Sequence, residues 1–257
     1  RYRAGTADDG SYAAGAPPLL FHSEVYRNLN WYLPNIVGNL HGAQEWEIFR
    51  PLQVGRTVRT RSTVVERYRK RGRDYLVNEV LITDTDGLWL QRSRTHQSFL
   101  VEDAGDAIVV DKQREKRSDR AFVVGDCDGP DLEPLAKTIT LEMCQAFSGP
   151  EVTYHTDREM ARAFGFPDVV VQGMMSVCFV SELMARSFGA GWENGGKLNV
   201  KLVNVVWPDD RLHVRGRVRE ETPEGAKRRV HVDVWCEKDD GVKTIVGSAS
   251  AVRVSTA

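Results

Sequence analysis

The side chains best suited to proton transfer lie close together between residues 147 and 175. Glu151, Tyr154 and His155 all fall within one span of five residues. An imidazole titrates near neutral pH, so it can take up a proton and return it, and a neighbouring carboxylate can orient the ring or a water molecule. A tyrosine hydroxyl is an alternative proton donor. These residue types at this spacing therefore indicate acid–base chemistry.

A short helix is predicted to hold this cluster in place. Thr156 and Glu159 have the S/T-x-x-E spacing of a capping box, so we expect a helix to begin just after Thr156 or Asp157. Gly165 can adopt the left-handed conformation that ends a helix, and Pro167 prevents its continuation. A loop that is fixed by such a helix can hold a catalytic side chain still.

A second, longer helix is predicted over 173–188. No proline interrupts this stretch, apolar residues fall on nearly every face, and Gly189 supplies a stop; such a helix is buried on most sides. Its first N–H groups, at Gly173 and Met174, have no partner within the helix and can stabilise negative charge developing on a carbonyl oxygen. Gln172 precedes them and can orient water, but it does not exchange protons at useful pKa values.

The composition argues against several classes of function. With 257 residues, of which 41% are hydrophobic, the chain can bury one large core or two small ones. A net charge of −1 gives no field that favours nucleic acid or an anionic membrane. We expect the basic run over 56–73 to be a solvated face, and contact with the phosphates of a CoA-type carrier is the alternative. Glu182 and Arg186 interrupt the one long apolar run, which argues against a membrane span.

The cysteines and histidines show no metal-binding pattern. The four cysteines are widely scattered without a C-x-x-C pair, and the histidines lack ligand spacing. We therefore predict reduced core thiols in a cytoplasmic protein and no metal site. The sequence starts at Arg1 instead of methionine, so a start and a targeting segment further upstream stay open.

The two halves of the chain resemble each other. In the first half a helix is predicted over 19–33 and strands over 44–49, 57–68, 74–83 and 88–101. In the second half a strand over 137–147 precedes the site, and strands over 198–206, 211–220, 226–237 and 242–254 follow the long helix. Placing Asp86-Gly87 on Asp240-Gly241 also places Val58 on Leu212 without a gap. This repeat suggests duplication of one unit, in which a curved antiparallel sheet wraps an apolar helix and two such sheets join.

The second half resembles the MaoC-like (R)-specific enoyl-thioester hydratases and dehydratases, which have the hot-dog fold. The resemblance is carried by Phe147-Ser148-Gly149, Tyr154-His155-Thr156-Asp157, Ala161, Gly165-Phe166 and Val171-Gln172-Gly173-Met174-Met175. The first half resembles the family's non-catalytic copy through HGAQEWEIFRPLQVG and TDTDGLWLQRSRTHQSFLV. The resemblance implies an α+β double hot-dog, two helix-wrapped antiparallel sheets joined into one continuous sheet. Residues 1–101 would form the non-catalytic, substrate-shaping half, 102–136 a charged connector, and 137–257 the catalytic half.

The resemblance also implies an activity. It predicts a hydro-lyase that adds or removes water across the 2,3 double bond of an acyl-CoA or acyl-carrier thioester. No cofactor is expected beyond the CoA or carrier that belongs to the substrate. The expected partner is the acyl thioester, with no nucleic acid and no membrane, and the expected assembly is a homodimer.

The motif departs from the family pattern S-G-D-x-N-P-x-H. Pro150 stands where the family has its aspartate, Val152-Thr153 stand in place of Asn-Pro, and Gln172 replaces a histidine. In the family the aspartate and the histidine together hold the reacting water. We predict that Glu151, one residue further on, pairs with His155, and that the Gly173 N–H binds the thioester oxygen. Three further residues are expected to contact the substrate: Tyr154, Gln172 and Met174.

Other readings stay open beside this one. With its acid lost to Pro150, the chain could be a degenerate hot-dog that binds acyl groups or partners an active subunit. A thioesterase or a double-bond isomerase could use the same scaffold. His155 could simply brace the helix start, and Gly173 could be small because the helix mouth is crowded.

Overall fold

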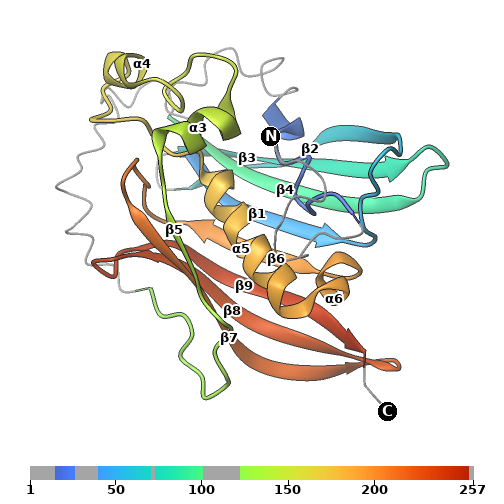
Figure 1. Cartoon of the computed structure of the whole chain (residues 1–257). Coiled ribbons are helices and arrows are strands. Elements are labelled where there is room, and N and C mark those ends of the chain that lie inside the picture. Colours follow the sequence, from blue (N-terminus) through green and yellow to red (C-terminus); the bar gives the residue numbers. More distant parts are fainter. Residues whose placement is uncertain (1–14, 27–39, 71–72, 101–121, 255–257) are drawn as a thin grey trace.

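A computed structural model describes residues 15–26, 40–70, 73–100 and 122–254. The nine strands in this part of the chain form one antiparallel sheet, in the order β2-β3-β4-β1-β6-β9-β8-β7-β5 (Figure 1). The strands are β1 (Leu40–Ile48), β2 (Val58–Lys70), β3 (Arg73–Asp84), β4 (Trp89–Leu100), β5 (Leu135–Thr138), β6 (Lys197–Leu202), β7 (Arg211–Glu224), β8 (Lys227–Lys238) and β9 (Lys243–Val254). The helices are α3 (Leu141–Ser148), α4 (Arg158–Ala163), α5 (Gly173–Phe188) and α6 (Ala190–Glu193).

The two halves of the sheet meet where β1 pairs with β6. Trp46 lies opposite Leu198 and Glu45 lies opposite Asn199 in this antiparallel pairing. The first four strands lie on one side of the junction and the strands of the second half lie on the other. Each half thereby covers an edge that the other would leave open. The predicted fold, two antiparallel sheets joined into one, is confirmed.

The repeat extends to the irregularities of the sheet. The bounds of β3 and β8, and those of β4 and β9, differ by 154 residues, the separation between Asp86 and Asp240 (240 − 86). The pairing of β2 with β3 shifts register after Val64, and that of β7 with β8 shifts after Val218, again 154 residues later. Because a bulge redirects a strand at one fixed position, a shared bulge indicates two copies of one unit.

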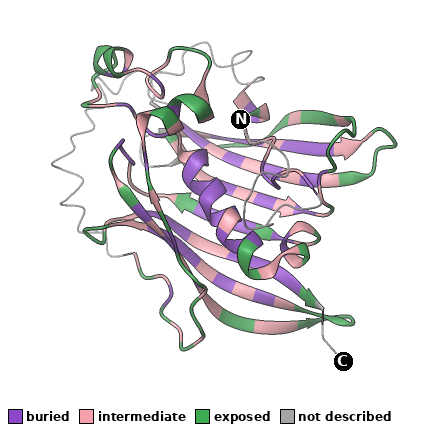
Figure 2. Cartoon of the chain, in the orientation of Figure 1, coloured by how far each residue is buried: buried purple, intermediate pink, exposed green. Residues whose placement is uncertain are grey.

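The buried helix α5 organises the core of the second half. It packs against β7, β8 and β9, and Val177, Val180 and Leu183 are completely buried in it (Figure 2). It begins at Gly173 and ends before Gly189, whose φ of 49° lies in the left-handed region, so the predicted helix over 173–188 is confirmed. No helix among the described residues is long and apolar enough to cross a membrane.

Two predicted elements are not found as predicted within the described residues. The strand predicted over 137–147 is wrong: β5 ends at Thr138, and α3 follows. Thr140 caps this helix, because its Oγ1 accepts a hydrogen bond from Met143 N at 3.2 Å, and this local interaction outweighs the apparent alternation. Of the helix predicted over 19–33, residues 24–26 are helical, and residues from 27 onward lie outside the described part.

The predicted connector is described from residue 122 onward. There it runs along β7, with Leu132 N donating to Gly216 O at 2.8 Å and Val218 N donating to Pro130 O at 2.9 Å. The Arg217 guanidinium also pairs with the Asp131 carboxylate at 2.7 Å. These contacts and β5 together cover the outer edge of β7.

Candidate active site at the start of helix α5

The loop before α4 is fixed by its own hydrogen bonds. Thr153 N donates to Thr156 Oγ1, and that hydroxyl donates to the Glu151 carbonyl, both at 2.9 Å. Asp157 is the N-cap of α4, because its carboxylate accepts from Met160 N at 2.8 Å. The predicted helix start is confirmed, with Asp157 rather than Thr156 as the capping residue.

The imidazole of His155 is held next to the start of α5. Its Nδ1 lies 2.7 Å from the Val170 carbonyl, and Val170 N donates to the Tyr154 carbonyl at 3.0 Å. A carbonyl can only accept, so Nδ1 carries the proton and the lone pair of Nε2 is left for a substrate. Burial lowers the pKa of His155, and the bond to Val170 opposes that shift. The ring is therefore neutral at pH 7, and it is held by the carbonyl of Val170, three residues before Gly173.

The N-terminal end of α5, at Gln172, Gly173 and Met174, is called the helix mouth below, and its first backbone N–H groups are available. The N-cap residue Gln172 makes no side-chain hydrogen bond to the helix, so it does not satisfy the first N–H groups. A Cβ added to half-buried Gly173 would overlap Leu202 Cδ2 and would lie 3.9 Å from His41 Nδ1. Glycine at this position thus lets the end of β6 and the start of β1 approach the helix mouth.

Polar and aromatic side chains surround this mouth. Ser148 Oγ donates to Gln172 Oε1 at 3.2 Å. Burial, with a smaller contribution from Tyr154, raises the pKa of the Tyr26 hydroxyl, and a hydrogen bond with Gln172 opposes the shift. The Tyr154 ring packs 4.1 Å from the His155 ring, centroid to centroid. Met174 is buried in the first turn of α5.

The structure thus brings most of the predicted site residues to one place, but Glu151 stays apart. Within the described residues, the Glu151 side chain is exposed and makes no hydrogen bond or ion pair, and the Nδ1 of His155 is bound to Val170 instead. The bond from Thr156 Oγ1 fixes the Glu151 carbonyl, while its carboxylate faces solvent. Its predicted pairing with His155 is not formed here.

Two residues at this site escaped sequence reasoning, His41 and Tyr26. A register shift between His41 and Ala43 marks a bulge at the start of β1, next to Gly42. His41 Nε2 donates to the Ala43 carbonyl at 3.1 Å, and Nδ1 is shielded from solvent and has no hydrogen-bond partner among the described residues. Both residues lie more than 100 positions before α5, so no local spacing connects them to the site.

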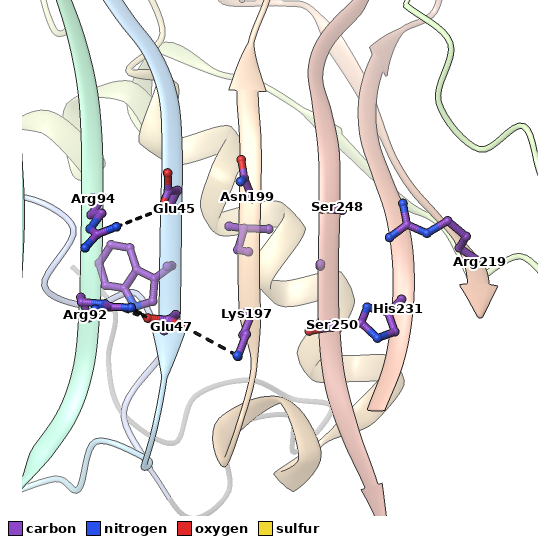
Figure 3. A pocket seen from close by; sticks show the side chains of 13 residues that line it. Glu45, Glu47, Arg92, Arg94, Lys197, Asn199, Arg219, His231, Ser248 and Ser250 are labelled. Carbon is purple, nitrogen blue, oxygen red and sulfur yellow. Dashed lines mark hydrogen bonds and ion pairs between the residues drawn. The ribbon is translucent and has the colours of Figure 1, made fainter. Parts of the chain in front are cut away.

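A hollow of about 220 Å³ lies elsewhere, on the outer face of the sheet where β1 joins β6 (Figure 3). Figure 3 shows α5 behind these strands, on the opposite face. The charges in the hollow are paired: Arg92 contacts Glu47, and Lys197 lies 3.8 Å from the same carboxylate. The helix mouth, where base and N–H groups meet, is the better candidate for chemistry. No three His, Cys, Asp or Glu side chains gather as metal ligands among the described residues.

Comparisons with known proteins agree with this fold. Residues 143–246, from α3 into β9, match the family model of the MaoC like domain. A solved MaoC-like dehydratase superposes with a TM-score of 0.72 and 18% identity, covering 98% of this chain and 88% of that chain. HtdX from Mycobacterium tuberculosis superposes with a TM-score of 0.62 and 15% identity, covering 95% of this chain and 90% of that chain. Peroxisomal multifunctional enzyme type 2 from Drosophila melanogaster superposes with a TM-score of 0.63 and 19% identity, covering 93% of this chain but 41% of that chain.

These findings define the class of protein. The chain has the sheet architecture of the hot-dog proteins, and residues 143–246 in its second half match the MaoC like domain. At these identities the solved structures establish the fold alone. A search of curated proteins gives no match.

Proposed function

We propose that the chain is a hydro-lyase that adds or removes water across the 2,3 double bond of an acyl-CoA or acyl-carrier thioester, with (R) stereochemistry at the hydroxylated carbon. The observation that carries the proposal is the His155 imidazole, which is fixed by the Val170 carbonyl with Nε2 available beside the uncapped start of α5. The MaoC-like dehydratase domain around it supports the same reaction class.

One imidazole can handle both proton transfers. Nε2 of His155 takes a proton from water as the water oxygen bonds to C3, and the negative charge moves to the thioester oxygen. The N–H groups of Gly173 and Met174 stabilise that charge. The imidazolium then gives its proton to C2, so the atoms of one water molecule are added in total. Dehydration is the reverse. The hydrogen bond between Ser148 and Gln172 supports a role for these side chains in orienting the water.

The proposal also covers the cofactor, the compartment and the assembly of the enzyme. Water addition needs a base, an acid and oxyanion donors, so no cofactor is required beyond the CoA or carrier of the substrate. The four cysteines are all free thiols, which supports a reducing, cytoplasmic setting. A homodimer belongs to the same proposal, and sedimentation analysis of the purified chain tests it.

The loss of absorbance as but-2-enoyl-CoA is hydrated tests the reaction. We expect His155→Gln to lower the rate roughly 10²–10⁴-fold, the usual contribution of a positioned base. His213→Gln is the matched control, because His213 pairs with Asp239 on the surface and should keep the full rate. Glu151→Gln decides the role of the carboxylate: a loss similar to that of His155→Gln would restore the predicted pair. Equal rates for wild type and His155→Gln would refute the proposal.

A binding module is the second candidate, favoured by the exposed Glu151 carboxylate and by Pro150 in the place of the family's acid. In that case the protein would bind the acyl thioester without hydrating it. Release of free thiol from the same substrate would point to a thioesterase instead. Equilibrium binding, the hydration signal and the thiol signal, measured on one preparation, separate the three.

A further inference from the structure

The inner faces of the two halves differ in polarity although the halves are copies. In the first half, inward-facing positions of β1, β3 and β4 carry buried polar side chains, whereas the positions 154 residues later carry buried apolar ones. The polar set is Gln44, Asn78, Gln91, Thr95 and Gln97, and the matching apolar set is Leu198, Val232, Ile245, Ala249 and Ala251. The fold itself is therefore built equally well without these amides.

In four members of this polar set each side chain has at least one hydrogen-bond partner, although Gln91 Nε2 has none among the described residues. Thr95 Oγ1 donates to Gln44 Oε1 at 3.0 Å, and Trp46 Nε1 donates to Gln91 Oε1 at 3.2 Å. Gln97 differs, because it is 1% exposed and, within the described part of the chain, both its Nε2 and its Oε1 lack a hydrogen-bond partner. Leaving both atoms of a buried amide unpaired is costly, and the equivalent position in the second half is an alanine. A role in folding does not explain Gln97.

The unpaired amide lies beside the helix mouth. Gln97 is the cross-strand partner of His41, so the two side chains are neighbours on the inner face. The unpaired Nδ1 of His41 lies 3.9 Å from where a Cβ of Gly173 would be. One turn into α5, on the same face as Gly173, Ser176 Oγ is also buried and has no partner in the residues that the structure describes. A buried amide without a partner thus neighbours an imidazole whose unpaired Nδ1 lies at the start of α5, next to the proposed oxyanion site.

We propose that Gln97 and His41 bind an uncharged polar group, foremost a hydroxyl, on the acyl chain of the substrate beyond C3. This inference rests on the proposed function and names its substrate class: acyl thioesters that carry a hydroxyl on the chain, in preference to plain alkenoyl chains. A hydroxyl can donate to the Nδ1 of His41 and accept from the Gln97 amide at the same time.

The chemistry of His41 excludes an acidic acyl group. Its Nε2 donates to the Ala43 carbonyl, and Nδ1 is therefore an acceptor while the ring is neutral. Burial lowers the pKa of His41 to about 4, and the interactions of the ring with the Ala43 carbonyl and the nearby Gln44 side chain oppose this shift only in part. At pH 7 the lone pair of Nδ1 would repel a carboxylate. The site can therefore tell a hydroxyl from both a methyl group and a carboxylate.

The test compares three thioesters of similar size: but-2-enoyl-CoA, 4-hydroxybut-2-enoyl-CoA and 3-carboxyprop-2-enoyl-CoA. For each we would measure kcat/KM for hydration and, separately, the equilibrium Kd. We expect the wild-type protein to prefer the hydroxylated thioester roughly tenfold or more, since two hydrogen bonds are gained. Gln97→Met, which preserves size, should lower that ratio several-fold, because one of the two hydrogen bonds is lost. The same variant should raise or keep Tm, because an unsatisfied amide is removed.

Gln91→Met is the matched control. Gln91 is on the same strand and face and is equally buried, but it lies six residues from Gln97, roughly 20 Å along the strand. It should keep the substrate preference and lower Tm, because Trp46 Nε1 loses its acceptor. Opposite behaviour of the two variants in preference and stability is what a binding role for Gln97 requires.

The outcomes separate this inference from the proposed function. Hydration of all three thioesters without preference, or a preference that Gln97→Met leaves unchanged, overturns the inference and leaves the hydro-lyase in place. A preference for the carboxylated thioester also overturns it. A preference in Kd that depends on Gln97, without hydration of any thioester, upholds the recognition site and removes the activity. No binding and no hydration would remove both.

Discussion

Gly173→Ala separates two reasons for a glycine at the start of α5, crowding and catalysis. The added Cβ would overlap Leu202 Cδ2, the flexible end of a half-buried side chain on β6. Overpacking costs about 1–3 kcal/mol, and replacing glycine by alanine in a helix returns up to about 1 kcal/mol. Because Leu202 can move partly aside, we expect the free energy of unfolding to fall by about 1 kcal/mol.

Leu202→Ala supplies the second half of this test, because it removes the overlapping atoms. In that background, Gly173→Ala should cost nothing or stabilise by up to about 1 kcal/mol. Gly173→Ala should also lower the hydration rate, because the methyl group occupies the space before the N–H groups, 3.9 Å from His41 Nδ1. This rate should not recover in the Leu202→Ala background, since the methyl group is still there. Urea unfolding followed by tryptophan fluorescence gives the stabilities, and hydration of but-2-enoyl-CoA gives the rates.

Two results would refute this reasoning. If the double variant recovers both stability and rate, Gly173 only makes room for Leu202, and the oxyanion role is wrong. If Gly173→Ala is as stable as the wild type with Leu202 in place, the packing at the helix mouth differs from that described.

Four further predictions concern the base, the loop, the core and the acid response. The base must be neutral, and burial lowers the pKa of His155. A plot of kcat/KM against pH should therefore rise with a midpoint below pH 6.5 and level off by pH 7. A midpoint above pH 6.5 would contradict this role of His155. Asp157→Ala removes the cap of α4 and should cost about 1 kcal/mol in thermal unfolding, with a lower hydration rate because the His155 loop loosens. Leu183→Ala should cost about 2–5 kcal/mol in urea unfolding, because it empties a fully buried site on α5, and a cost below 1 kcal/mol would contradict that packing. His41 has its pKa lowered to about 4 by burial, so the unfolded chain binds more protons between pH 6.5 and 4. Stability should therefore fall as pH drops through that window, and His41→Leu should flatten the curve.

Much of the fold could be predicted because its signals are local. The turns at Asp86-Gly87 and Asp240-Gly241 bracket long strands in both copies, and the unbroken apolar stretch between Gly173 and Gly189 has the length of one helix. The stretch after Lys137 failed because two local signals compete there. Its residues alternate in polarity like a strand, but the Thr140 hydroxyl caps a helix start.

The same distinction between local and long-range signals decides which residues of the site could be predicted from the sequence. His155 and Gly173 are close in sequence, and the Val170 carbonyl connects them, so a motif could place them together. His41 reaches the helix mouth only through the pairing of β1 with β6 and a bulge, which depend on the whole sheet. Glu151 shows the opposite case: closeness in sequence to His155 does not bring its carboxylate to the ring, because the loop turns it outward.

The edge strand β2 bears on how the protein behaves at high concentration. In the described part of the sheet it has a neighbour on one side only, β3, so its other side could recruit another chain and start a fibre. Arg59 and Arg61 stand exposed on this edge, and the bulge after Val64 bends it. Two copies meeting here would oppose like charges on a kinked template. The edge therefore resists polymerisation, and a protein that extends the sheet there needs acidic side chains.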